Sequence, residues 1–244
     1  MSASVLSDDQ MKRFVMAADA VDLIVRLHDR EPDAEFITGL KANPLSDWFS
    51  VFMPVQTPQQ FDQAISSLPD PLPQEVLDDL AAEYADIFLT HGYRASPNGS
   101  VWLTEDRIER QEPMFEARSW YDHYYVKVPD WRIRADDHLV HELQFVSHLL
   151  RLGSDTAAAD AARFMDKNLL PWLSQFAGQV LKLCRHRYFA GSMELTVASM
   201  ESIRDLLEDI CGVARPVPVD ETALPKRAQV PFEQPYFPGA SESW

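Results

Sequence analysis

The chain has 244 residues, of which 46% are hydrophobic, so it is long and apolar enough to bury a sizeable core. A formal net charge of −16 argues against nucleic acid or an anionic membrane as partner, because both bind basic surfaces, and it favours a basic ligand. Cys184 and Cys211 lie in apolar helical patterns, which favours buried free thiols over a disulfide or a metal pair. The N-terminus lacks a basic region followed by an apolar run, and no apolar run reaches membrane-spanning length, so we expect a cytoplasmic protein.

Helix signals begin close to the N-terminus. Ser7 and Gln10 form a capping-box pattern, and the apolar stripe that follows predicts a helix to about His28. Farther on, Thr57 followed by Pro58 has the pattern of a cap and a first helical position. We therefore expect a second well-capped helix to begin at Thr57.

Three segments between residues 73 and 125 are rich in aromatic residues. Residues 73–92 have helical periodicity and are expected to end as a helix at His91-Gly92. Residues 97–103 begin with turn formers and end in Val-Trp-Leu, which predicts an irregular segment packed back onto the core. Pro113 opens a helix whose aromatic residues are predicted to be mainly core, namely Phe115, Trp120, Tyr121, Tyr124 and Tyr125.

A charged helix start lies near the middle of the chain, in residues 134–153. Its apolar residues recur on one helical face, and Gly153 is placed to end the helix. Either Asp136 or Asp137 could cap it, because aspartate accepts hydrogen bonds from the unpaired N–H groups at a helix N-terminus. His138 and Glu142 are four residues apart and therefore project from one side.

The remainder of the chain is predicted to contain three more helices and a tail. The helices cover residues 155–170, a segment that begins at Pro171, and a last long helix set off by Gly191-Ser192. Residues 213–244 are rich in proline and lack helical periodicity, so they form an extended tail that either docks on the body or stays solvated.

These patterns predict an all-α protein, a helical bundle built from two helical parts and a tail. The N-terminal part covers residues 1–130, the C-terminal part 131–212 and the proline-rich tail 213–244. The segment 128–137 has the composition of a hinge, since Pro129 interrupts the helical pattern there. A hinge of this kind permits either a monomer or a domain-swapped homodimer.

Several segments, in the same order, resemble the TorD/DmsD/NarJ family of molybdoenzyme maturation chaperones. The resemblance spans roughly residues 75–205. It rests on Tyr84-x-x-Ile87-Phe88, the Pro97–Leu103 segment, Asp137-His138 with Glu142-Leu143 and Phe145, Leu169–Trp172, and Tyr188–Met200.

The resemblance implies a TorD-like all-α fold and a cytoplasmic chaperone that is not an enzyme and uses no cofactor. Proteins of this family bind the twin-arginine signal peptide of a molybdopterin oxidoreductase precursor. They hold that precursor for cofactor insertion before export, as the maturation of enzymes of anaerobic respiration requires. The implied partners are therefore the signal peptide and the body of such a precursor, with no nucleic acid and no membrane insertion.

A receptor for such a leader needs carboxylates beside an apolar groove, because the leader has a basic part and an apolar part. The candidate carboxylates are Asp136, Asp137 and Glu142, with His138 beside them. Candidates for the groove are Tyr84, Ile87, Phe88, Val101 and Trp102. Ser100 completes the predicted peptide-binding set through its place in the 97–103 segment.

Two alternatives of other classes remain open on the sequence alone. His138, His141 and Glu142 have the spacing of converging helical ligands, which would suit a metal-dependent hydrolase or oxygenase. The motif lacks the paired pattern of the usual zinc helices, so the favoured interpretation includes no metal. The second alternative is a helical scaffold protein without leader specificity. The sequence contains no phosphate-binding loop or nucleophile elbow, so no catalytic residue is assigned.

Overall fold

The structure is a computed structural model that describes residues 6–90 and 92–217. It is all-α, and no β-strand forms in these two ranges beyond one isolated bridge between Asn98 and His138. The helices are α1 (Asp8–Asp29), α2 (Ala34–Ala42), α3 (Ser46–Phe49), α4 (Gln56–Ser66), α5 (Gln74–Phe88), α6 (Gly99–Leu103), α7 (Glu112–His123), α8 (Leu139–Leu152), α9 (Asp155–Phe164), the π-helix η1 (Met165–Leu169), α10 (Leu170–Leu183) and α11 (Arg187–Cys211).

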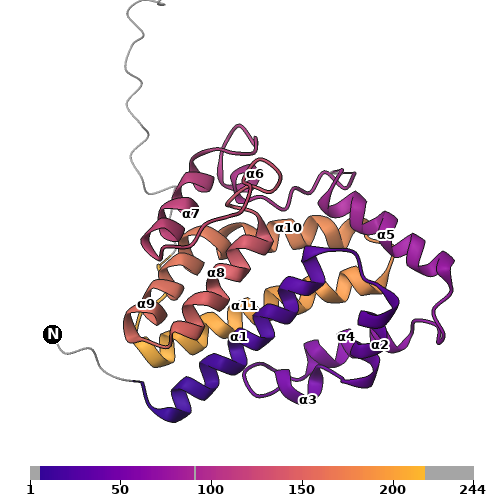
Figure 1. Ribbon diagram of the computed structural model, residues 1–244, viewed down its shortest axis with the longest axis horizontal. Coiled ribbons are helices and arrows are strands. Elements are labelled where there is room, and N and C mark those ends of the chain that lie inside the picture. The colour runs from indigo at the N-terminus through magenta and orange to yellow at the C-terminus, as the bar shows by residue number, and fades with distance from the viewer. Residues whose placement is uncertain (1–5, 91, 218–244) are drawn as a thin grey trace, which may run out of the picture.

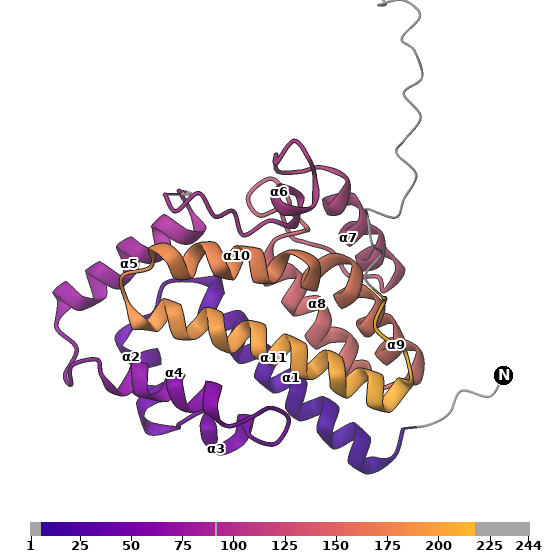
Figure 2. The ribbon, with the colours of Figure 1, turned by 180° about the vertical axis from the view of Figure 1, so that it is seen from behind.

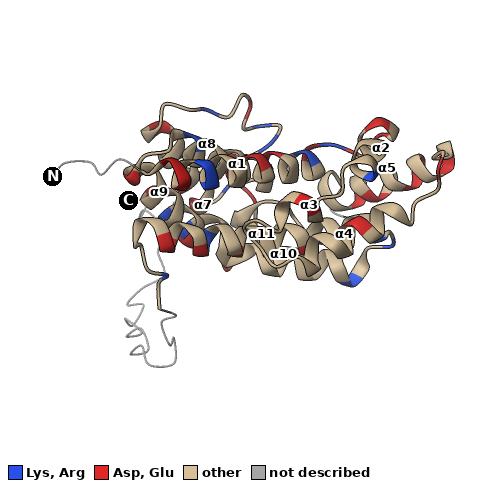
Figure 3. Ribbon diagram, turned by 90° about the horizontal axis from the view of Figure 1, so that it is seen from below, with Lys and Arg blue, Asp and Glu red and all other residues tan. Residues whose placement is uncertain are grey.

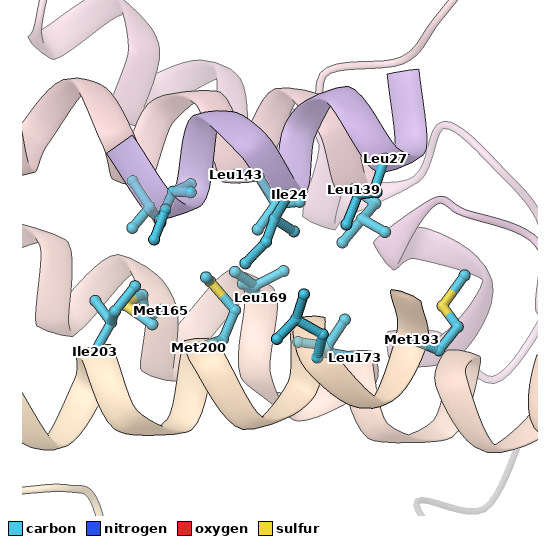
Figure 4. Close-up of a cluster of buried hydrophobic side chains, with 14 of the residues drawn as sticks. Ile24, Leu27, Leu139, Leu143, Met165, Leu169, Leu173, Met193, Met200 and Ile203 are labelled. Carbon is cyan, nitrogen blue, oxygen red and sulfur yellow. The ribbon is translucent and has the colours of Figure 1, made fainter. Parts of the chain in front are cut away.

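Two layers of long helices enclose the core. α1 and α8 lie side by side in one layer, and α10 and α11 form the other (Figures 1 and 2). Figure 4 shows apolar side chains of both layers meeting between them, among them Ile24 and Leu143 from the first layer and Leu173 and Met200 from the second. Burial of these fully enclosed side chains supplies the main driving force for the fold.

The shorter helices cover the ends and sides of these layers. α4 packs on α11, and α2 and α3 pack on α4. α6 lies on α10 and contacts α7, so the aromatic segments before residue 125 form a cap over one end of α8 and α10 (Figure 1). The predicted division into parts 1–130 and 131–212 stays a prediction. The predicted tail, 213–244, lies outside the described residues beyond Val217.

Local signals at several helix ends are confirmed. Ser7 Oγ accepts a hydrogen bond from the N–H of Gln10, and Gln10 Oε1 accepts one from the N–H of Ser7, which completes the capping box. Gly153 ends α8 in the left-handed region at φ 59°, and Ser154 caps α9. A Cβ at Gly153 would meet only the flexible end of the Met11 side chain, so it is the left-handed backbone conformation that favours glycine there.

Three predicted boundaries are wrong. α4 begins at Gln56 after Val55, so Thr57 lies inside the helix and does not cap it. α5 ends at Phe88, before the predicted His91-Gly92 stop. Gly191-Ser192 lies within α11, because the helix already begins at Arg187 and Gly191 packs against Phe61 of α4. At Thr57 and Gly191 the local cap and turn preferences were overridden by the packing of α4 against α11.

Other predictions were wrong about the type of local structure or about the burial of side chains. The two helices predicted on either side of Pro171 are joined without a break, since the π-helix η1 connects α9 to α10. Residues 99–103 form the short helix α6. The aromatic residues of α7 are not all core: Tyr121 is buried, but Phe115 is about half exposed and Tyr125 is 94% exposed in a left-handed turn after the helix. Both cysteines are free but only half-buried.

Acidic positions are spread along α1, α2 and α5 rather than gathered in one patch (Figure 3). In the described part of the chain, no helix combines the length and the apolar character that crossing a membrane would require.

Candidate functional site

Two segments of the resemblance, near residues 97–100 and 137–139, are joined by hydrogen bonds. The N–H of Leu139 donates to the carbonyl of Pro97 at 2.8 Å, and the N–H of Gly99 donates to the carbonyl of Asp137 at 2.9 Å. The Asp137 carboxylate accepts from the backbone N–H and the hydroxyl of Ser100 at 2.7 and 2.5 Å. The start of α6 and the start of α8 are therefore one structural unit.

Asp137 is completely buried in this unit. Burial raises its pKa, and the two hydrogen bonds from Ser100 oppose that rise. Its second carboxylate oxygen, Oδ1, has no hydrogen-bond partner. The carboxylate is thus used to hold the 97–100 segment and is not presented to solvent.

The N-terminus of α8 is capped by His138, which corrects the predicted cap by Asp136 or Asp137. His138 Nδ1 accepts a hydrogen bond from the N–H of Val140 at 3.1 Å. Neither aspartate is available for that role. Asp137 binds Ser100, and Asp136 forms a two-point pair with Arg118 at 3.3 and 2.7 Å.

Glu142 lies one turn into α8 and is also buried. Burial, with a contribution from the nearby Asp137, raises its pKa well above the ordinary value. Its Oε2 accepts a hydrogen bond from the indole N–H of Trp172 at 3.2 Å. The same indole backs the 97–100 segment, because a Cβ at Gly99 would lie 3.1 Å from Trp172 Nε1.

A cleft of about 290 Å³ opens beside this unit, between the end of α5 and the two joined segments. Of the predicted site residues it brings together Tyr84, Phe88 and His138. Ile87, Ser100, Asp136, Asp137 and Glu142 are buried and do not line it, and Trp102 is half-buried with its indole bonded to the carbonyl of Ser96. The cleft is lined by Tyr84, Phe88, Leu89, Pro97, Asn98, Glu109, Arg110, Ile133, Arg134, Ala135 and His138.

Two polar residues of the cleft, Asn98 and Glu109, were not predicted. The Asn98 amide donates to Glu109 Oε1 at 2.9 Å and to Ser96 Oγ at 3.1 Å. Asn98 is 6% exposed, and its Oδ1 is buried without a hydrogen-bond partner. The sequence identified Asn98 only as a turn former, and nothing in the local pattern of Glu109 indicates that it meets Asn98 in a cleft.

The arginines at the rim are committed to other groups. Arg134 binds the Asp29 carboxylate at 2.6 Å, and Arg110 donates to the carbonyl of Arg132 at 2.9 Å. Among the residues that line the cleft, Glu109 supplies the carboxylate and lies beside the Asn98 amide.

A second hollow, of about 200 Å³, lies along α8 on the other side of the 126–135 loop. Its walls are mostly apolar, with Val126, Val128 and Phe145 among them. A shallower depression lined by Pro129, Ile133 and His141 lies between this hollow and the cleft. The surface thus runs from a polar cleft to an apolar hollow.

The proposed metal ligands of the alternative hypothesis do not form a site. His138 Nδ1 caps α8, His141 Nδ1 lies 2.9 Å from the carbonyl of Ala135, and Glu142 binds Trp172. Within residues 6–90 and 92–217, no group of three or more His, Cys, Asp or Glu side chains is placed to hold a metal ion. The helical spacing alone does not make these three residues converge.

The fold and site define a helical protein with an acceptor-bearing cleft between joined loops. The family model for the nitrate reductase delta subunit matches residues 56–178, half of the chain and the part that contains the whole cleft. The chain belongs to this family, and the resemblance to TorD-like chaperones is confirmed.

Curated relatives agree with this membership. The chain is 26% identical over 136 residues to the chaperone protein TorD of Shewanella piezotolerans, covering 52% of this chain and 62% of that protein. It is 25% identical over 146 residues to TorD of Vibrio cholerae, covering 56% and 66%. For TorD of a Psychrobacter species the identity is 26% over 153 residues, covering 57% and 66%. The chain thus spans just under two thirds of the length of these relatives.

Proposed function

We propose that this protein is a maturation chaperone for a molybdopterin oxidoreductase and that it is not an enzyme. It binds the twin-arginine leader of the precursor in the cytoplasm and holds the precursor until its cofactor is inserted, before export. The observation that carries the proposal is the pair of acceptors, Asn98 Oδ1 and Glu109, beside the aromatic rings of Tyr84 and Phe88.

A guanidinium group fits this combination. It is a planar donor of up to five hydrogen bonds, it pairs with carboxylates, and it stacks on aromatic rings. Glu109 supplies a carboxylate, and the unpartnered Asn98 Oδ1 supplies a further acceptor at the same place. A buried acceptor without a donor is unfavourable, and a bound arginine would satisfy it.

The apolar part of a leader fits the surface next to the cleft. Leu89 and Ile133 line the cleft and are 62% and 85% exposed, which leaves apolar area available for burial by a ligand. The depression at Pro129 continues this surface to the hollow at Phe145. A leader with its arginines at Glu109 would lay its apolar residues along this path.

The predicted peptide-binding residues that are buried away from the cleft do not contact a ligand directly. They hold the segments that form the walls of the cleft. Asp137 and Ser100 fix the segment that carries Asn98, and Glu142 holds the Trp172 indole behind Gly99. Asp136 anchors Arg118 and accepts through its carbonyl from the Tyr121 hydroxyl at 2.8 Å. We therefore propose positioning roles for these residues and direct contact for Tyr84, Phe88, Asn98 and Glu109.

Titration calorimetry tests the proposal, with a synthetic twin-arginine leader from a molybdopterin oxidoreductase of the same organism. We expect saturable binding that weakens on the order of tenfold when both leader arginines are replaced or when Glu109 is changed to Gln, since loss of one charged hydrogen bond costs about 1.5–3 kcal/mol. Glu105→Gln is the matched control, because Glu105 is an exposed acid of the same loop. Equal binding of the native and arginine-free leaders would refute the proposal.

A further inference from the structure

The cleft suggests a second occupant, which lies in the chain's own C-terminal segment. Residues 218–244 contain one basic pair, Lys226-Arg227, and apolar residues follow it at Val230, Phe232 and Phe237. This is the same order of basic and apolar residues that the proposed leader site accepts. The segment is proline-rich, and such chains bind grooves at a low cost in conformational entropy.

We propose that residues 226–232 occupy the cleft of the same chain as an internal competitor of the leader. The proposal rests on the function proposed above and adds a form of regulation to it. Lys226 and Arg227 would donate to Glu109 and Asn98 Oδ1, and Val230 and Phe232 would cover the exposed side chains of Leu89 and Ile133.

The point where the tail leaves the body favours this occupant. The buried Arg204 pairs with Asp166 of η1 at 2.7 Å and donates to the carbonyl of Val213 at 3.0 Å. The chain therefore passes beside η1 at Val213, and Arg215 then pairs with Glu201 and Asp205 of α11. The next residue of η1, Lys167, pairs with Glu116 of α7 at 2.5 Å, so α7 lies next to that place.

α7 leads from the departure point toward the cleft. Glu116 and Glu112 lie one turn apart on it, about 6 Å along the axis. Glu109 precedes Glu112 by three residues, at most about 10 Å of chain. The nine residue steps from Val217 to Lys226 reach about 28 Å when extended at 3.1 Å per residue, which is enough to follow α7 to the cleft.

The glutamates along α7 would attract the basic pair Lys226-Arg227. A hollow on α7 is lined by Glu112, Glu116 and Trp120, together with Ser119 and Lys167. A positively charged dipeptide that moves along α7 toward Glu109 therefore passes carboxylates and meets an acceptor pair at the end of the path.

The test compares leader affinity in three full-length proteins by titration calorimetry. These are the wild type, Lys226→Ala/Arg227→Ala, and Lys12→Ala/Arg13→Ala. The last pair lies on exposed positions of α1 and changes the net charge equally. A tethered competitor acts at an effective concentration of about 1 mM, so a segment that binds at roughly 100 μM would weaken the leader about tenfold. We expect the tail variant, and not the α1 variant, to bind the leader about tenfold more tightly.

A synthetic peptide of residues 222–238 provides the direct measurement. It should displace the leader from the tail variant, and Glu109→Gln should weaken both ligands. Equal leader affinity in all three proteins would overturn the internal competitor and leave the leader function standing. Absence of leader binding in all three would refute the leader function itself. Inhibition that grows with protein concentration would place a second copy's tail in the cleft and would also overturn the proposal.

Discussion

The carboxylate of Asp137 accepts two hydrogen bonds from Ser100, one from its backbone N–H and one from its hydroxyl, across 37 residues of sequence. This pairing sets the position of Asn98 relative to α8, since the bridge between Asn98 and His138 is part of the same contact. The cleft therefore depends on a group that does not line it.

Replacing Asp137 with Asn should destabilise the protein and weaken leader binding together. Hydrogen bonds to a charged acceptor contribute about 1.5–3 kcal/mol, and we expect the free energy of unfolding in urea to fall by about that amount. Ser100→Ala retains the backbone donor and should cost roughly 1 kcal/mol. A double-mutant cycle that shows no coupling between positions 100 and 137 would contradict this account.

Glu142 should make the protein less stable as pH rises. Its pKa is raised by burial in the folded state, so the folded protein retains a proton that the unfolded chain has released above about pH 4.5. Stability therefore falls from that pH up to the raised pKa. In Glu142→Gln this loss should be absent, so urea midpoints measured from pH 4.5 to 8 should increasingly favour the variant. Parallel pH profiles for the two proteins would show that Glu142 does not titrate in this way.

His28 should make the protein less stable as pH falls. Burial lowers its pKa from 6.5 to about 3, and its Nε2 lies 2.7 Å from Thr196 Oγ1. The unfolded chain takes up a proton below pH 6.5 that the folded protein excludes, so stability falls as pH decreases from 6.5 toward 3. His28→Gln can retain the contact with Thr196 and should lose less stability between pH 7 and pH 5. Thermal or urea unfolding at these two pH values measures the difference.

Two glycines provide a matched test of how closely Trp172 backs the cleft. A Cβ at Gly99 would lie 3.1 Å from the indole nitrogen, whereas one at Gly178 would meet nothing within 4 Å. Trp172 is fully buried and bonded to Glu142, so it has little room to move. Gly99→Ala should cost about 1–3 kcal/mol through overpacking, and Gly178→Ala should stabilise α10 by about 0.5–1 kcal/mol. Urea unfolding followed by tryptophan fluorescence measures both, and a stabilising Gly99→Ala would be the contrary result.

The all-α fold could be predicted because most helix signals are local. The Ser7-Gln10 capping box and the Gly153 stop depend only on nearby residues, and both are confirmed. Thr57 and Gly191-Ser192 show the limit of that reasoning. Their local preference for helix ends is weaker than the packing of α4 against α11, which keeps both positions inside helices.

The site could be predicted only in part, because its residues meet through long-range contacts. Tyr84, Phe88 and His138 were predicted and do line the cleft. Asn98 and Glu109 were not, since their pairing depends on how the 96–111 loop folds back on itself. The sequence also could not show that Asp137 and Glu142 are buried, because aspartate and glutamate are usually exposed and only the tertiary fold encloses them.

The position of Trp172 behind Gly99 has a consequence for synthesis on the ribosome. The cleft walls come from residues 84–138, but the indole that supports one wall lies on α10 and is made later. A nascent chain that ends before α10 lacks this support, although it already contains every residue that lines the cleft. The wall of the cleft that Trp172 supports is therefore completed only after α10 has been synthesised, so the cleft reaches its final form later than its own lining residues do.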